Sequence, residues 1–134
     1  MAKVKIKSTV AEQKKLAEGI YSMWLLAEEI AVQAKPGQFI SVYSNDKSRV
    51  LPRPISICEI DREQGKLRIV YRVVGKGTEE FSKASSGDTF EILGPLGNGF
   101  PLEEAKGKRV LMVGGGIGVP PLLQTAKEAE AEAV

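Results

Sequence analysis

The sequence predicts a mainly β fold, in which a six-stranded antiparallel barrel is followed by the first strand and helix of an α/β domain. Two observations support this prediction. Up to residue 93, the apolar residues fall into six short runs separated by turn-forming residues, which is typical of a small antiparallel barrel or sandwich. From residue 105 onward, a near-continuous apolar run leads into a glycine-rich loop and a helical pattern, as in doubly wound domains.

The barrel strands are predicted from alternation and from their β-branched and aromatic residues. In the first run, Lys3, Lys5 and Lys7 alternate with Val4 and Ile6. The run that begins at Leu67 is the most apolar of the six. We expect strands at residues 3–10, 19–26, 39–43, 55–60, 67–74 and 89–93.

Turns and short helices are predicted between these strands. Residues 35–38 form a Lys-Pro-Gly-Gln turn signal, and residues 61–66 predict a hairpin turn around their glycine. Residues 28–34 are ambiguous, and a short helical turn is one interpretation. Residues 78–84 predict a short helix that Thr78 caps.

The pattern changes near residue 105, so we expect a barrel domain at residues 1–104 and an incomplete Rossmann-like domain at residues 105–134. Residues 109–113 predict a strand buried on both faces of a parallel sheet. A glycine loop and a helix at residues 119–134 follow. One strand and one helix cannot bury their own faces, so we expect this unit to be part of a larger domain.

Composition excludes several classes of function. The 134 residues carry 19 basic and 17 acidic groups, a net charge of +2, and the two signs are interspersed, so we expect no nucleic-acid partner. The apolar runs are shorter than the roughly 20 residues of a membrane span, so we expect no membrane association. Without histidine, these residues form neither a Ser-His-Asp triad nor a His-containing zinc site. The single cysteine, Cys58, fits a reducing compartment, and we expect a cytoplasmic protein.

Four motifs are candidates for binding chemistry. The first places Arg53 between two prolines at the start of a strand, where a rigid guanidinium can clamp a phosphate. Alternation predicts Ser56 and Cys58 on one face of this strand, with Ile55 and Ile57 on the other. The alternative is a proline-bounded edge strand with a solvated arginine.

The second and third motifs are glycine-rich. Residues 71–78 end a strand with two glycines and a threonine, and free N–H groups at a helix start can bind an anion. The alternative is a tight turn with a capping threonine. Residues 94–101 contain three glycines and two prolines, which favours a constrained loop connecting two domains.

The fourth motif is the glycine loop at residues 114–118, followed by Pro120 and Pro121. Such a loop can face a pyrophosphate, and the prolines suit a first helical turn. The loop departs from G-x-G-x-x-G, because Pro121 stands where the last glycine would be. The alternative is a tight strand-to-helix turn that binds nothing.

Together and in this order, the motifs resemble the ferredoxin reductase-like flavoproteins, and among them the electron-transfer subunits of NAD-dependent (type B) dihydroorotate dehydrogenases. The resemblance covers residues 5–128 and implies a Greek-key barrel that binds FAD, then a domain that binds NAD. In this family, which serves pyrimidine biosynthesis, electrons pass from NADH to FAD, to a [2Fe-2S] cluster and to an FMN-containing catalytic subunit. The matching segments are PGQF (36–39), RPISI (53–57), YRVVGKGT (71–78), GPLGNGF (94–100) and VGGGIGVPPL (113–122).

The resemblance also implies roles for particular residues. Arg53 would contact the FAD diphosphate, and Gly77 and Thr78 would donate hydrogen bonds to it. Ser56 would lie near the reactive edge of the flavin. The remaining residues would border the flavin and ribityl chain (Pro54, Ile55, Val70, Tyr71 and Arg72) or face NADH (Gly114, Gly115, Gly116 and Gly118). No residue is expected to act as a catalytic acid or base.

The chain departs from this family in length and in cysteine content. Family members are considerably longer and carry a cysteine cluster, whereas this sequence contains only Cys58. We therefore expect no iron–sulfur cluster in these residues and no activity from them alone. One alternative function is a flavoprotein subunit of a ferredoxin–NADP transhydrogenase or hydrogenase. The other is a non-catalytic barrel that only docks a partner.

Overall fold

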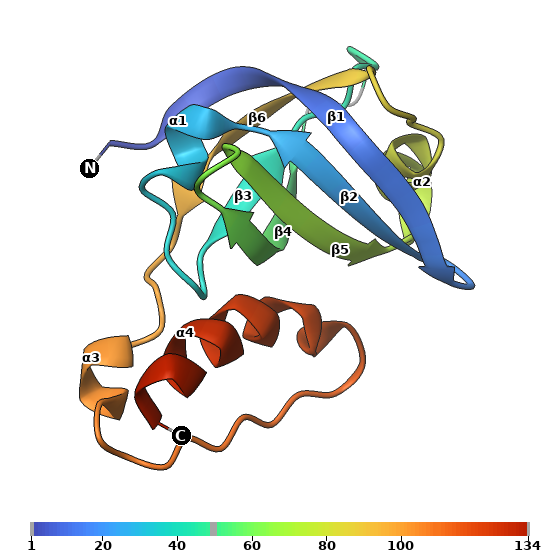
Figure 1. Cartoon of the computed structure of the whole chain (residues 1–134). Coiled ribbons are helices and arrows are strands. Elements are labelled where there is room, and N and C mark those ends of the chain that lie inside the picture. Colours follow the sequence, from blue (N-terminus) through green and yellow to red (C-terminus); the bar gives the residue numbers. More distant parts are fainter. Residues whose placement is uncertain (1, 49–50, 134) are drawn as a thin grey trace.

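The computed structural model describes residues 2–48 and 51–133. Six antiparallel strands form a closed barrel in the order β1-β2-β5-β4-β3-β6 (Figure 1). Because β6 returns beside β3 after the β3-β4-β5 meander, the topology is a Greek key, and the predicted barrel is confirmed. The strands are β1 (Val4–Ala17), β2 (Ile20–Leu26), β3 (Phe39–Val42), β4 (Arg53–Asp61), β5 (Lys66–Arg72) and β6 (Thr89–Leu96).

Inward-facing aliphatic and aromatic side chains fill the barrel. Each such side chain stabilises the fold by about 1.5–3 kcal/mol when it leaves water. The largest fully buried members are Met23, Leu25, Ile30, Ile40, Ile57, Leu67, Ile69, Phe81 and Ile92. Phe81 packs edge-on against Phe90, with 5.1 Å between the ring centroids.

Two short helices complete the barrel, and the remaining helical elements follow it. α1 (Glu28–Ala31) lies between β2 and β3, and α2 (Gly75–Ser82) lies between β5 and β6. After the barrel come α3 (Leu102–Ala105), the 3₁₀ turns η1 (Gly116–Gly118) and η2 (Pro120–Leu122), and α4 (Leu123–Ala133). Figure 1 shows α4 lying below the barrel, with the segment between α3 and η1 passing beneath it.

Several element boundaries differ from the sequence prediction. β1 continues to Ala17, well past residue 10, because its polar second half pairs with β2: Glu12 lies opposite Trp24, and Lys15 opposite Tyr21. β5 ends at Arg72 rather than at residue 74. β1 is longer and β5 is shorter than the sequence predicts. Pairing with neighbouring strands decides where a strand ends, and it outweighs the hydrophobicity of the local sequence.

The strand predicted at residues 109–113 is wrong. Residues 109–115 have no regular secondary structure, and the side chains of Leu111 and Val113 are 88% and 83% exposed. A strand needs a neighbour for its backbone hydrogen bonds, and no other described strand pairs with these residues. The helix predicted at residues 119–134 starts instead with η2 and continues as α4, while residue 134 lies outside the described residues.

The connector at residues 94–101 is fixed against the turn that precedes β3. The Phe100 N–H donates to the Pro36 carbonyl (2.9 Å), and the Gln38 carboxamide donates to the Gly97 carbonyl (2.9 Å). Gly37 has a φ of +95°, and a Cβ there would lie 2.8 Å from the Phe100 side chain. The predicted turn therefore needs a glycine both for its backbone conformation and for this close approach.

Candidate cofactor cleft

A cleft of about 440 Å³ opens between the barrel and the 3₁₀ turns that precede α4. Its volume lies within the range of small-molecule sites, about 300–1,000 Å³. It brings together all the residues that the sequence predicted for FAD except Gly77. The lining residues are Arg53, Pro54, Ile55, Ser56, Val70, Tyr71, Arg72, Val74, Thr78, Ile117 and Pro121.

The first wall of the cleft is the start of β4. Pro54 lies opposite Ser41 of β3, and its ring fixes φ next to Arg53. Ile55 is buried in the barrel, whereas Ser56 is exposed at the cleft. The sequence predicted Ser56 and Cys58 on one face of the strand. Ile55 and Ile57 belong to the barrel core and Cys58 does not, as this alternation predicts, although Cys58 is buried and the strand register shifts after Ile57.

The second wall is the end of β5. Tyr71 is only 3% exposed and stacks on Tyr21, with centroids 6.0 Å apart. Its hydroxyl donates to the Gln13 side-chain oxygen (2.6 Å). Burial raises the pKa of the Tyr71 phenol well above its ordinary value, so the hydroxyl stays protonated and remains a donor.

The charge of the cleft is positive. Arg53 and Arg72 are the charged lining residues, and both are exposed. Within residues 2–48 and 51–133, neither guanidinium has a hydrogen bond or an ion pair with a protein group. Two free planar cations at a cleft suit a ligand that carries phosphate groups.

The third wall is the start of α2, which begins at Gly75 rather than at Thr78. The capping role predicted for Thr78 is therefore wrong in position. Its hydroxyl instead accepts from the Val74 N–H (2.7 Å) and lies 2.8 Å from the Val74 carbonyl. Gly77 does not line the cleft, but a Cβ there would lie 3.1 Å from Nε of Arg53, so the glycine leaves room for that guanidinium.

The glycine loop and the turn after it reach the cleft through Ile117 and Pro121, two residues of the fourth motif to which the sequence assigned no cofactor contact. None of the predicted glycines (Gly114, Gly115, Gly116 and Gly118) is among the lining residues. Gly116 has a φ of +57° and lies against Arg72, since a Cβ there would be 3.8 Å from its Nη2. Nothing in the sequence marks an apolar residue within or beside a glycine motif as one that contacts a ligand.

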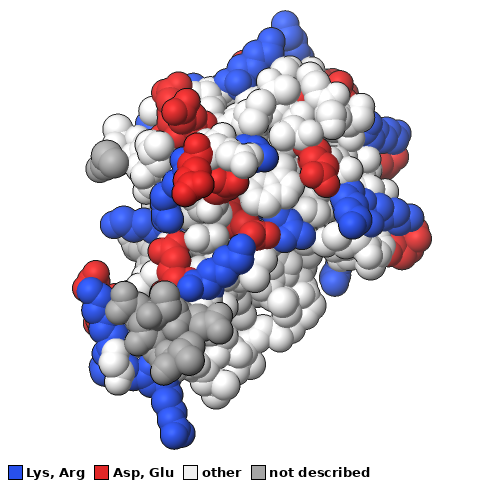
Figure 2. Space-filling model, in the orientation of Figure 1, with Lys and Arg blue, Asp and Glu red and all other residues white. Residues whose placement is uncertain are grey.

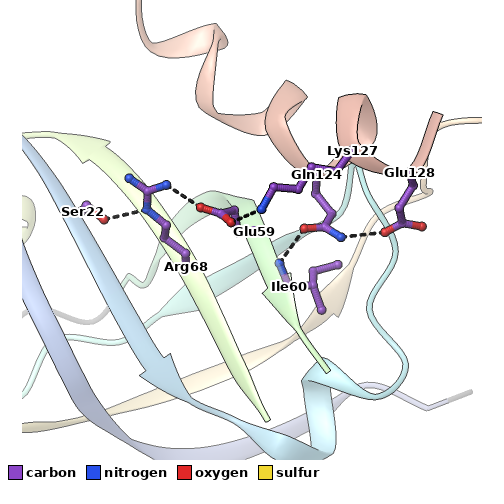
Figure 3. Close-up of polar contacts among 7 residues, drawn as sticks. All are labelled: Ser22, Glu59, Ile60, Arg68, Gln124, Lys127 and Glu128. Atoms are coloured by element: carbon purple, nitrogen blue, oxygen red, sulfur yellow. Dashed lines mark hydrogen bonds and ion pairs between the residues drawn. The ribbon is translucent and has the colours of Figure 1, made fainter. Parts of the chain in front are cut away.

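Polar contacts between the barrel and α4 fix the position of this loop (Figure 3). The buried Ile60 N–H donates to Gln124 (2.9 Å), and the Gln124 amide donates to Glu128 (2.8 Å). Glu59 accepts from Arg68 (2.5 Å) and pairs with Lys127. Burial alone would raise the pKa of Glu59, but hydrogen bonds from Lys127 and Arg68 outweigh it and lower that pKa, so the carboxylate stays charged.

The comparison with protein families decides what kind of domain this is. Residues 4–100, which include the whole barrel and three of the four motifs, match the model of the oxidoreductase FAD-binding domain. The chain belongs to the oxidoreductase FAD-binding domain family. The sequence-based assignment to ferredoxin reductase-like flavoproteins is therefore confirmed.

Relatives of this FAD-binding domain include the electron transfer subunits of dihydroorotate dehydrogenase B (NAD(+)). The subunit from Bacillus caldolyticus is 48% identical over 122 residues, 90% of this chain and 48% of that protein. The subunit from Streptococcus mutans is 46% identical over 121 residues, 90% of this chain and 46% of that protein. The chain thus spans about half the length of these relatives, and the predicted resemblance to this family is confirmed.

Solved structures show the same fold. An NADH-dependent reduced ferredoxin-NADP oxidoreductase matches 93% of this FAD-binding chain and 44% of its own chain, with 31% identity and a TM-score of 0.85. Phthalate dioxygenase reductase matches 97% of this chain and 41% of its own, with 26% identity and a TM-score of 0.75.

Two kinds of feature are absent from the described part of the chain. It contains no helix with the length and apolar character needed to cross a membrane. Within the same residues, His, Cys, Asp and Glu form no group of three that could hold a metal ion. On the face shown in Figure 2, acidic and basic side chains are interspersed over the barrel.

Proposed function

We propose that this chain binds FAD in the 440 Å³ cleft and forms part of the electron transfer subunit of a dihydroorotate dehydrogenase B. The observation that carries the proposal is the convergence of three motifs, distant in the sequence, on one cleft with two unpaired guanidiniums among the described residues. The family match and the relatives' names support it.

Different residues of the cleft bind different parts of the cofactor. Arg53 binds the diphosphate together with the start of α2, where Gly77 and Thr78 donate hydrogen bonds to it. Pro54, Ile55 and Ser56 border the flavin ring, and Val70, Tyr71 and Arg72 pass along the flavin and ribityl chain. The flavin supplies the redox chemistry when bound, so these residues bind and orient it. This division explains how the site works without histidine.

The proposed electron path reaches beyond the cleft. Electrons enter from NADH, which the loop of Gly114, Gly115, Gly116 and Gly118 faces. A [2Fe-2S] cluster outside these residues would carry them on to the FMN-containing catalytic subunit, in the cytoplasm. Cys58 is the single cysteine of the sequence and is buried, so the proposed cluster takes its ligands from outside these residues. The division into a barrel domain at 1–104 and a Rossmann-like start at 105–134 belongs to the same proposal.

A visible absorbance spectrum of the desalted protein, recorded before and after addition of FAD, tests the cofactor. We expect a flavin band that stays with the protein through a second desalting step. Loss of the whole band after loading would contradict FAD binding and favour a barrel that only docks a partner. Such a barrel would associate through the exposed side chains of Leu111 and Val113, and light scattering would show a size that increases with concentration.

A second function is favoured by one comparison, the ferredoxin-NADP oxidoreductase structure with a TM-score of 0.85. In that case the partner would be a ferredoxin-linked subunit rather than a dihydroorotate dehydrogenase. Binding of the FAD-loaded chain to an FMN-containing dihydroorotate dehydrogenase subunit, compared with binding to ferredoxin, separates the two functions. Neighbouring genes for pyrimidine biosynthesis would favour the first.

A further inference from the structure

One carboxamide, that of Gln13 in β1, connects three elements of the barrel. Its oxygen accepts the hydroxyl hydrogen of Tyr71 in β5 (2.6 Å). Its nitrogen donates to the carbonyls of Phe81 (2.8 Å) and Ala84 (2.7 Å) at the C-terminal end of α2. The Phe81 carbonyl also accepts from the Ala84 N–H (3.1 Å), and Ala84 follows the last residue of α2, so Gln13 binds the turn that ends the helix.

These three bonds join two walls of the cleft. Tyr71 belongs to the β5 wall, and α2 carries Thr78, which also lines the cleft, with Gly77 beside Arg53. Tyr71 also packs edge-on against Phe81, with 6.3 Å between the ring centroids. The ring contact resists movement along one direction only, whereas directional hydrogen bonds fix both the helix and the phenol.

The direction of the amide has a consequence for the phenol. The two helix carbonyls accept hydrogen bonds only, so the Gln13 nitrogen must face them and its oxygen must face Tyr71. The Tyr71 hydrogen is therefore directed to Gln13. A ligand in the cleft meets the ring and backbone of Tyr71, and not a phenolic donor.

We propose that Gln13 is a positioning residue of the cofactor site, which sets the spacing between the Tyr71 wall and α2 so that the flavin and the diphosphate are held at the same time. This inference rests on the proposed function. FAD spans both walls, whereas riboflavin has no diphosphate and needs only the flavin wall.

The test compares the affinities of Gln13→Met, Gln13→Glu and the native chain for FAD and for riboflavin. Gln13→Met keeps the side-chain length and removes all three bonds, so we expect FAD affinity to fall by about tenfold or more and riboflavin affinity to fall much less. Gln33→Met is the matched control, because Gln33 also donates to two backbone carbonyls (Ala2 and Glu29), neither of which belongs to a residue that lines the cleft.

Gln13→Glu makes the FAD affinity depend on pH, which a general loss of packing would not do. At about pH 8 the carboxylate still accepts from Tyr71 but repels the two carbonyls. At about pH 5 it gains a proton, because carbonyl neighbours and partial burial raise its pKa, and it then donates to one of them. Tyr71, its titratable contact, stays protonated throughout. We expect FAD affinity to recover in acid for Gln13→Glu and not for Gln13→Met.

Equal losses of FAD and riboflavin affinity, or unchanged FAD affinity in Gln13→Met, would overturn the inference. If the native chain binds no FAD, the proposed function itself fails, and the cofactor role of Gln13 fails with it. Amide hydrogen exchange in the FAD-free chain separates these results. We expect faster exchange in α2 for Gln13→Met than for Gln33→Met, and equal rates would show that Gln13 does not hold the helix.

Discussion

At the scale of single residues, the cleft depends on charges that the protein leaves unpaired. Arg53 has no ion pair among the described residues, and Gly77 leaves space beside its guanidinium. A carboxylate partner would stabilise the folded chain but would compete with a phosphate for the same donors. The free arginine therefore favours ligand binding over stability.

Arg53→Ala is expected to weaken FAD binding by about tenfold or more, since one charge-assisted contact contributes at least about 1.4 kcal/mol. A titration followed by flavin fluorescence measures the change. Lys14→Ala removes one exposed positive charge outside the cleft and should leave the affinity within about twofold. Equal effects of the two substitutions would show that only the net charge matters.

Sequence reasoning at this scale found residues whose chemistry is local. Arg53 was recognised because the prolines on either side of it restrict the backbone, and this can be read from the sequence alone. Gln13 was not recognised, because nothing in a polar strand end shows that Tyr71 and the end of α2 meet there. The register shift after Ile57 was not predicted, because a bulge cannot be deduced from alternation.

At the scale of elements, polar contacts attach α4 to the barrel. Glu59 has a side chain only 16% exposed and lies between Arg68 and Lys127. Because its folded-state pKa is lowered, its contribution to stability is complete above the pKa of the unfolded chain. That contribution is lost as the pH falls through the lower folded-state value.

Glu59→Gln is expected to lower the free energy of unfolding by about 2 kcal/mol near neutral pH, because two cations lose their acceptor. Denaturant unfolding at a series of pH values measures it. The difference from the native chain should shrink below about pH 4, where the native carboxylate is protonated too. A difference that stays constant with pH would exclude an electrostatic role for Glu59.

Helices and strands differ in how far the sequence predicts them. The runs that form β3, β4 and β5 were located because their alternating or apolar residues face the barrel interior. The apolar run at residues 109–113 has the same local character and forms no strand, since strand formation depends on a neighbouring strand. The start of α2 was misplaced because Val74, a residue without capping chemistry, precedes it.

At the scale of the whole molecule, contacts between distant turns hold the barrel in shape. The turn before β3 and the connector after β6 meet where Gly37 faces Phe100. Gly37→Ala is expected to lower the free energy of unfolding by about 1–3 kcal/mol, from the positive φ and the close contact together. Gly19→Ala separates the two causes, because Gly19 has a φ of +73° but open space around it. Equal losses in thermal or denaturant unfolding would assign the whole effect to backbone conformation.

The pairing of the first strand with the last has a consequence for synthesis. Val4 lies opposite Gly94, and Thr9 opposite Thr89, so the barrel joins residues about as far apart along the chain as the sheet allows. During translation, β1 has to wait for β6 to leave the ribosome before the sheet closes. The hairpin of β4 and β5, which carries two walls of the cleft, pairs locally and much earlier. The nascent chain thus forms two walls of its cofactor site before the barrel closes. Flavin that binds to these walls during synthesis would stabilise the partly folded chain and so favour folding.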